Sequence, residues 1–140
     1  MRLCDGRLKP RPHGSYDIRR QDQALIVTIE GSWNLEAYLE FVEVFKAAAE
    51  PLCQQPWGVL VDIRRWGLST PEVAEADEAL QVWTLRNNQR WRAYVSDRSA
   101  LKQGQIENYS APVAGGIESR FFDATGDARR WFQDVGILSG

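Results

Sequence analysis

The first regular pattern in the chain is an alternation of hydrophobic and polar residues that follows a polar N-terminal leader. Tyr16 and Ile18 alternate with polar neighbours. After a polar break at 21–23, Leu25, Val27 and Ile29 alternate with a second set, Ile26, Thr28 and Glu30. A period of two is typical of strands with one buried face, and a short polar break between two such strands favours a hairpin. The sequence therefore predicts an antiparallel β-hairpin whose second strand ends at Gly31.

A helical spacing of hydrophobic residues follows this hairpin. Ser32 or Asn34 is suited to cap a helix, and Pro51 ends the pattern after about Glu50. The side expected to lie on a sheet carries hydrophobic residues three and four positions apart. These residues are Leu35, Tyr38, Leu39, Val42, Phe45 and Ala49.

The same helix carries a second hydrophobic stripe, which contact with one sheet does not require. Three explanations remain open from the sequence: a neighbouring helix of the same chain, the surface of a homodimer or protein partner, and an apolar ligand. The stripe consists of Ala37, Phe41, Val44 and Ala48.

A short continuous hydrophobic run at 59–61 comes next. A run without polar alternation predicts a central, parallel strand that is covered on both faces. Residues 64–69 are interpreted as a polar loop. The cap residues Ser69 or Thr70, with Pro71 in the first turn, predict the start of a second helix.

The second helix and the C-terminal part complete the order of elements. A strand is predicted over 90–96, with Arg92 and Tyr94 facing outward, then a weak helix near 101–109, a strand over 118–123 and a closing helix. This order predicts an α/β fold, in which a mixed sheet opens with an antiparallel hairpin and continues with parallel strands and crossover helices. The hydrophobic stripe of the second helix consists of Val73, Ala76, Leu80 and Trp83.

Length and charge limit the class of protein. The chain has 140 residues, of which 44% are hydrophobic, and a formal net charge of −2, which fits a single domain over 15–140. Residues 1–14 are interpreted as a flexible basic arm, because four basic residues stand there against one acidic residue. We expect a cytoplasmic protein, since no hydrophobic run reaches the roughly 18 residues of a membrane span and no signal-peptide core is present.

Reactive side chains are scarce. One histidine, one methionine and two cysteines leave few residues for a metal site or a nucleophile–base pair, so we expect no enzyme, no metal and no cofactor. The slightly acidic balance disfavours nucleic acid as a partner, although Arg90, Trp91 and Arg92 interleave basic and aromatic residues. Six tryptophans favour a chain that acts through contact surfaces.

Candidate binding residues follow the predicted central strand. Arg64, Arg65 and Trp66 lie between the carboxyl end of that strand and the next helix, which is where open α/β sheets bind ligands and anions. A salt bridge with Asp62 is the alternative explanation of the two arginines.

Three segments of the chain carry a family resemblance. They read GSYDIRR…ALIVTIEGSWN near the N-terminus, GVLVDIRRWGLSTPE in the centre and ESRFFDATGDARRWF near the C-terminus. This set resembles the SpoIIAA-like family, a branch of the STAS (sulfate transporter and anti-sigma-factor antagonist) and Sec14-type structural superfamily. The resemblance covers about 15–138 and implies a STAS-like fold.

The resemblance to STAS antagonists implies a switch. Those proteins bind a protein partner and are controlled by phosphorylation of a serine at the start of the helix after a central strand, which corresponds by position to Ser69 or Thr70. The antagonist pattern has Asp-Ser followed closely by Gly, whereas Gly67 precedes the hydroxyl groups here. Arg64 or Arg65 could pair with a phosphate, and a simple helix cap is the alternative role of the two hydroxyl residues.

Sec14-type relatives hold lipids or other apolar molecules between helices and sheet, so the resemblance has a second implication. We expect a non-catalytic regulatory or protein-interaction domain that acts on a protein partner or as a homodimer. The alternative is a carrier of a lipid-like apolar small molecule in a pocket between helices and sheet.

Overall fold

The structure is a computed structural model that describes residues 14–97 and 116–140. The expected basic arm, apart from its last residue, and the weak helix near 101–109 lie outside the described residues.

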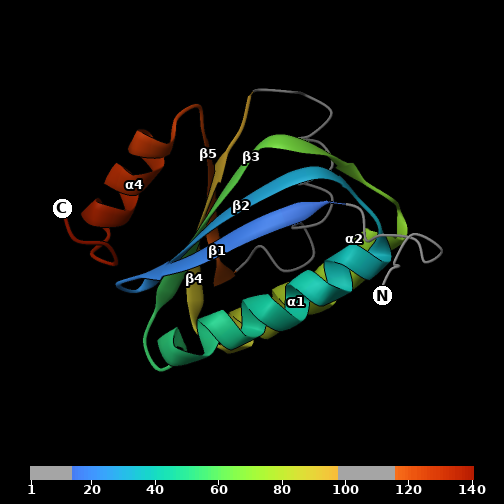
Figure 1. Ribbon diagram of the computed structural model, residues 1–140. Coiled ribbons are helices and arrows are strands. Elements are labelled where there is room, and N and C mark those ends of the chain that lie inside the picture. Colours follow the sequence, from blue (N-terminus) through green and yellow to red (C-terminus); the bar gives the residue numbers. More distant parts are fainter. Residues whose placement is uncertain (1–13, 98–115) are drawn as a thin grey trace, which may run out of the picture.

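Five strands form one mixed sheet in the order β1-β2-β3-β4-β5 (Figure 1). The first pair is antiparallel, and every later pair is parallel. The predicted hairpin and the predicted mixed sheet are therefore confirmed. The strands are β1 (Ser15–Gln21), β2 (Ala24–Trp33), β3 (Trp57–Ser69), β4 (Gln89–Val95) and β5 (Glu118–Phe122).

The helices cover the sheet from both sides (Figure 1). Helix α1 (Leu35–Ala49) connects β2 with β3, α2 (Glu72–Arg86) connects β3 with β4, and both lie on the same face. A 3₁₀ turn, η1 (Glu50–Leu52), follows α1, and α4 (Thr125–Asp134) covers the opposite face.

The start of α1 follows from its capping residue. The side-chain oxygen of Asn34 accepts a hydrogen bond from the Ala37 N–H at 2.9 Å, which satisfies one of the N–H groups that a helix start leaves unpaired. Pro51 lies in the 3₁₀ turn that ends the helix. Asn34, one of the two predicted caps, is thus confirmed.

Alternation along the central strands separates two hydrophobic layers. Val59 faces the layer under α1 and α2, whereas Leu60 faces the layer under α4. Strand β3 is therefore covered on both faces, as its continuous hydrophobic run predicts.

The predicted polar loop at 64–69 is wrong, because β3 continues to Ser69. Strand β2 likewise continues past Gly31 to Trp33, and the two strands stay paired, with Gly31 opposite Trp66 and Trp33 opposite Ser69. Burial of Ile63 and Trp66 stabilises this extension. Alternation fails here, because a register shift between Asp62 and Arg65 places Ile63 and Trp66, three positions apart, in the same hydrophobic layer.

Candidate functional site

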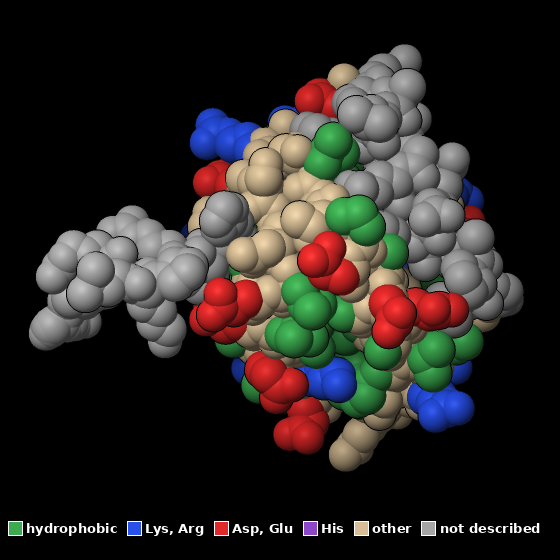
Figure 2. Space-filling view, turned by 90° about the vertical axis from the view of Figure 1, so that its right-hand side faces the viewer, with side chains coloured by type: hydrophobic (Ala, Val, Ile, Leu, Met, Phe, Trp, Pro, Cys, Tyr) green, Lys and Arg blue, Asp and Glu red, His purple; other side chains and the backbone are tan. Residues whose placement is uncertain are grey.

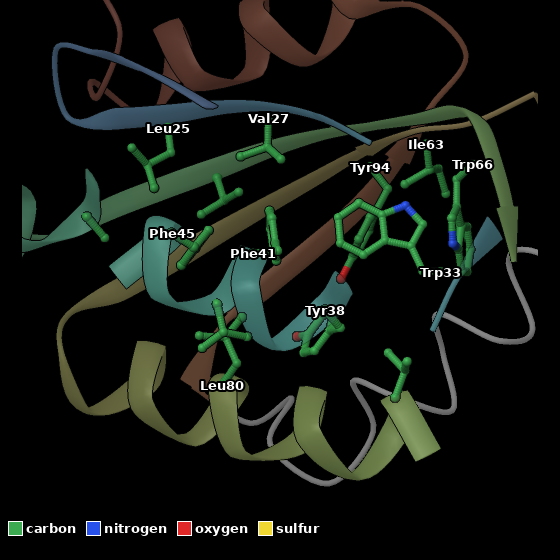
Figure 3. Close-up of a cluster of buried hydrophobic side chains, with 14 of the residues drawn as sticks. Leu25, Val27, Trp33, Tyr38, Phe41, Phe45, Ile63, Trp66, Leu80 and Tyr94 are labelled. Carbon is green, nitrogen blue, oxygen red and sulfur yellow. The ribbon is translucent and has the colours of Figure 1, made fainter. Parts of the chain in front are cut away.

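A cavity of about 100 Å³ lies between the sheet and the pair of helices α1 and α2. Aromatic side chains from α1 and from the ends of β2 and β3 form part of its wall, and Figure 3 shows this cluster. Phe41 and Phe45 point from α1 toward the sheet in this view. The hydrophobic lining includes Trp33, Phe41, Phe45, Val59, Ile63 and Trp66.

The remaining wall of the cavity is polar and comes from α2 and β4. Asp77, Gln81 and Thr84 lie four and three residues apart on α2 and line the cavity together with Gln89 and Arg92. The side of α2 that faces the interior therefore differs from the predicted hydrophobic stripe, of which only Val73 and Leu80 are buried. Ala76 and Trp83 are only half-buried, whereas the polar residues of the neighbouring stripe face the interior.

Asp77 is the centre of a hydrogen-bond network in this wall. The Tyr38 hydroxyl donates to Asp77 Oδ1, and the Gln81 side-chain amide donates to Asp77 Oδ2 at 3.1 Å. The carboxyl group lies in the interior, although the residue as a whole is only half-buried. Burial raises the pKa of the Asp77 carboxyl, and the two hydrogen bonds and the charge of Arg92 only partly oppose this effect.

Tyr38 remains a donor at neutral pH. Burial raises the pKa of its phenol well above the ordinary value of 10.0, and the nearby Asp77 raises it further. The phenol therefore keeps its proton and donates it to Asp77 Oδ1, in a hydrogen bond that is charge-assisted when Asp77 is ionised.

Arg92 carries a positive charge into the same wall. Only 5% of the residue is exposed, and its Nη2 donates to Gln89 Oε1 at 3.2 Å and to Thr84 Oγ1 at 3.5 Å. Within residues 14–97 and 116–140, no carboxylate oxygen lies within 4.0 Å of its guanidinium. The outward orientation predicted for Arg92 and Tyr94 is wrong, because both sides of β4 are covered and both residues are buried.

The ionisation of Asp77 is expected to destabilise the fold. An acid whose native pKa lies above its unfolded value of 3.8 binds its proton more tightly in the folded chain. We compare the free energy of unfolding of Asp77→Asn with that of the wild type. The difference, variant minus wild type, is expected to increase as the pH rises above 3.8 and to become constant above the native pKa of Asp77. Chemical denaturation from about pH 3 to pH 8 measures this difference.

Asp62→Asn is the control, because its effect on the free energy of unfolding should depend on pH in the opposite direction. Burial alone would raise the pKa of the Asp62 carboxyl, but hydrogen bonds from Arg64 and the charges of Arg64 and Arg65 lower it below 3.8. Its ionisation therefore stabilises the fold, and this contribution is lost as the pH falls through the native pKa. Equal pH profiles for the two variants would contradict the assignment of Asp77.

The predicted binding residues Arg64, Arg65 and Trp66 lie on the extended end of β3, not in a loop, and their side chains separate. Nε and Nη2 of Arg64 donate to the two carboxylate oxygens of Asp62 at 3.0 and 2.7 Å, which is the alternative arrangement that the sequence allowed. The Arg65 side chain is 80% exposed and lies 3.6 Å from Glu30. Trp66 is buried and lines the cavity.

The junction between β3 and α2 holds the two candidate phosphorylation residues. Ser69 is half-buried, and its hydroxyl accepts a hydrogen bond from Trp66 Nε1 at 3.2 Å. Thr70 is exposed. The predicted cap is wrong, because Pro71 is the N-cap of α2 and no side chain makes a capping hydrogen bond.

Leu68, just before these residues, has a φ of 94°. Residues with a Cβ rarely adopt positive φ, and such strain costs roughly 1–3 kcal/mol. The pairing of β3 with β2 before and after Leu68, at Trp66 and at Ser69, holds the residue in this conformation. Strained backbone gathers at functional sites, so Leu68 marks the junction as a candidate surface.

The second stripe of α1 does not form a continuous surface. Ala37 and Phe41 are buried within the chain, Ala48 is half-buried, and Val44 is 42% exposed. Packing within the same chain thus covers Ala37 and Phe41. In the part of the chain that the structure describes, the exposed large hydrophobic residues are Val44 and Leu39, which was predicted to face the sheet.

Figure 2 shows the side of the molecule at which α1 and α2 begin. Hydrophobic side chains gather there among several acidic ones. Over the described ranges, no group of three or more His, Cys, Asp or Glu residues could hold a metal ion. No helix of the described part is long and apolar enough to cross a membrane.

Two solved structures share this architecture. One is an uncharacterized protein of the DUF3478 family with a SpoIIAA-like fold from Shewanella loihica PV-4, with a TM-score of 0.66 and 18% identity over 90% of this chain and 98% of that chain. The other is an anti-sigma factor antagonist from Mycobacterium paratuberculosis, with a TM-score of 0.57 and 8% identity over 86% of this chain and 95% of that chain. No protein-family model and no curated protein matches the sequence. The chain therefore has the SpoIIAA-like fold that its sequence predicts.

Proposed function

We propose that this SpoIIAA-like domain is a non-catalytic regulatory module of the cytoplasm that binds a protein partner through the junction between β3 and α2. The observation that carries the proposal is the strained end of β3, where the half-buried Leu68 lies between the exposed residues Arg65 and Thr70. The fold shared with an anti-sigma factor antagonist supports the same class of function. Such similarity at the level of fold is an analogy, so the proposal depends on the junction itself.

Arg65 is the side chain of this junction that is best placed to meet a partner. It is 80% exposed, and its ion pair with Glu30 is long, at 3.6 Å. An exposed pair of this kind contributes little to stability. Arg65 can therefore exchange Glu30 for an acidic group of a partner at little cost to the fold.

Thr70 is the better candidate of the two for phosphorylation. Its side chain is exposed, whereas Ser69 is half-buried and its hydroxyl contacts the Trp66 indole. A phosphate on Thr70 adds a charge of about −1.5 to −2 to the proposed contact surface. We therefore expect phosphorylation of Thr70 to change binding more than to change folding.

A lipid-like ligand is less well supported by the cavity. Its volume of about 100 Å³ is smaller than the roughly 150 Å³ of an engineered cavity that holds benzene. A lipid chain would need α1 and α2 to move away from the sheet. The carrier function therefore stays a prediction.

Affinity capture from a lysate of the source cells tests the proposed surface. Arg65→Glu is expected to reduce capture of the specific partner at least tenfold, because a repulsive charge then lies in the contact. Thr70→Glu is expected to reduce it as well, whereas Thr70→Ala should keep it. Mass spectrometry of the captured protein, followed by titration of the purified pair, provides the measurement.

Arg130→Glu on α4 is the matched control. Its side chain is 73% exposed and also lies 3.6 Å from a carboxylate, that of Asp127, but it lies on the opposite face of the sheet. We expect this variant to capture the partner as well as the wild type does. If the Arg65 and Arg130 variants bind equally, the partner does not use the junction.

A further inference from the structure

We propose that the cavity between the sheet and the helices α1 and α2 is a binding site for a small neutral molecule of the phenol class, with a hydrophobic body and one hydroxyl group. This site goes beyond the protein-binding function proposed above and does not depend on it. Three features of the described residues define the ligand: the size of the cavity, one unpaired acceptor and the balance of charge in the polar wall.

The lining of the cavity suits one small aromatic ring, and the cavity needs only a small expansion to admit it. A volume of about 100 Å³ approaches the roughly 150 Å³ that holds benzene in an engineered cavity, so a small adjustment of side chains admits a molecule of this size. Three aromatic rings form a continuous wall, since Phe41 lies 5.4 Å from Trp33 and 5.7 Å from Phe45 between ring centroids. Edge and face contacts with such rings favour an aromatic ligand.

The unpaired acceptor is the side-chain oxygen of Gln81. The residue is only 6% exposed, and its Oε1 is the buried side-chain atom without a hydrogen-bond partner among the described residues. The amide nitrogen donates to Asp77 Oδ2, and when Asp77 is ionised this fixes the orientation, since a flipped amide would place two acceptors against each other. The buried oxygen therefore needs a donor from the cavity, and a ligand hydroxyl supplies one.

The polar wall favours a neutral ligand. Arg92 and Asp77 both line the cavity and interact electrostatically, so an ionised Asp77 balances the charge of the guanidinium. Nε and Nη1 of Arg92 make no hydrogen bond to another described residue. The guanidinium thus retains donors for the oxygen of the same hydroxyl group, whereas an anion would meet the carboxylate of Asp77.

Titration with phenol, followed by NMR spectroscopy of the tryptophan indole N–H groups, tests the site. The signals of Trp33 and Trp66, which line the cavity, should shift, whereas those of Trp91 and Trp131 in the layer under α4 should not. Fluorobenzene has nearly the same size but lacks the donor. We expect phenol to bind about tenfold more tightly than fluorobenzene, the effect of one buried hydrogen bond.

Gln81→Met removes the acceptor and keeps the length of the side chain. We expect this variant to bind phenol no better than fluorobenzene, and Gln133→Met, at an exposed position of α4, to bind phenol like the wild type. The site is excluded if phenol shifts none of the indole signals or shifts those of both layers equally. The role of Gln81 is excluded if the wild type binds phenol and fluorobenzene equally, a comparison that holds even if Gln81→Met does not fold.

Discussion

Phe41→Ala is expected to lower the free energy of unfolding by about 3–5 kcal/mol, the usual loss when a buried aromatic ring leaves a cavity. Phe41 is 7% exposed and lies among four aromatic rings. The distances between ring centroids are 5.3 Å to Tyr16, 5.4 Å to Trp33, 5.8 Å to Tyr38 and 5.7 Å to Phe45. Urea denaturation followed by circular dichroism measures the loss.

Val44→Ala is the control from the same predicted stripe. Val44 is 42% exposed, so we expect its truncation to change the free energy of unfolding by less than about 1 kcal/mol. A large difference between the two variants would show that the stripe is divided between core and surface. Similar losses at both positions would instead indicate that a second copy of the chain covers Val44 in solution.

Arg92→Met is expected to lower the free energy of unfolding by about 3 kcal/mol, since it leaves buried polar groups without a partner. Thr84 Oγ1 and Gln89 Oε1 lose a donor, and the carboxylate of Asp77 loses its balancing charge. Arg86→Met, at an exposed position near the end of α2, should change stability by less than about 0.5 kcal/mol.

A double-mutant cycle separates the electrostatic part of this loss. In the Arg92→Met background, Asp77→Asn should be less destabilising than in the wild type, because the unbalanced carboxylate is then removed. Additive losses would show that the two charges do not interact. A loss at Arg92 as small as that at Arg86 would show that the polar wall contributes nothing to the fold.

Local sequence patterns predict the helices and strands well, but they do not predict which side of each helix faces the core. The predicted sheet-facing stripe of α1 includes Leu39, which is exposed, and omits Ala37 and Phe41, which are buried. A hydrophobic stripe wide enough to contact only a sheet is too narrow for α1, because this helix contacts strands β1 and β2 and also helix α2. Contacts between distant segments therefore decide which of two neighbouring stripes is the core.

The polar wall was missed for a related reason. The sequence pattern predicts an exposed Arg92, because a charged residue in an alternating strand is ordinarily exposed. Local alternation cannot show that helices cover both faces of β4. A signal was nevertheless present. Asp77, Gln81 and Thr84 share a side of α2 with Val73 and Leu80, and polar residues at helical spacing within a hydrophobic face indicate a buried network.

The joint extension of β2 and β3 has an electrostatic consequence for the edge that Figure 2 shows. Because Trp33 is paired with Ser69, helices α1 and α2 begin beside each other at this edge. Each contributes the positive end of a helix dipole, equivalent to roughly half an elementary charge. Acidic residues in both first turns, Glu36 and Glu72, stabilise these ends. Because these two carboxylates already occupy the helix ends, an acidic partner would be attracted at this edge by Arg65 and repelled by Glu36 and Glu72. Added salt would weaken its contact with Arg65.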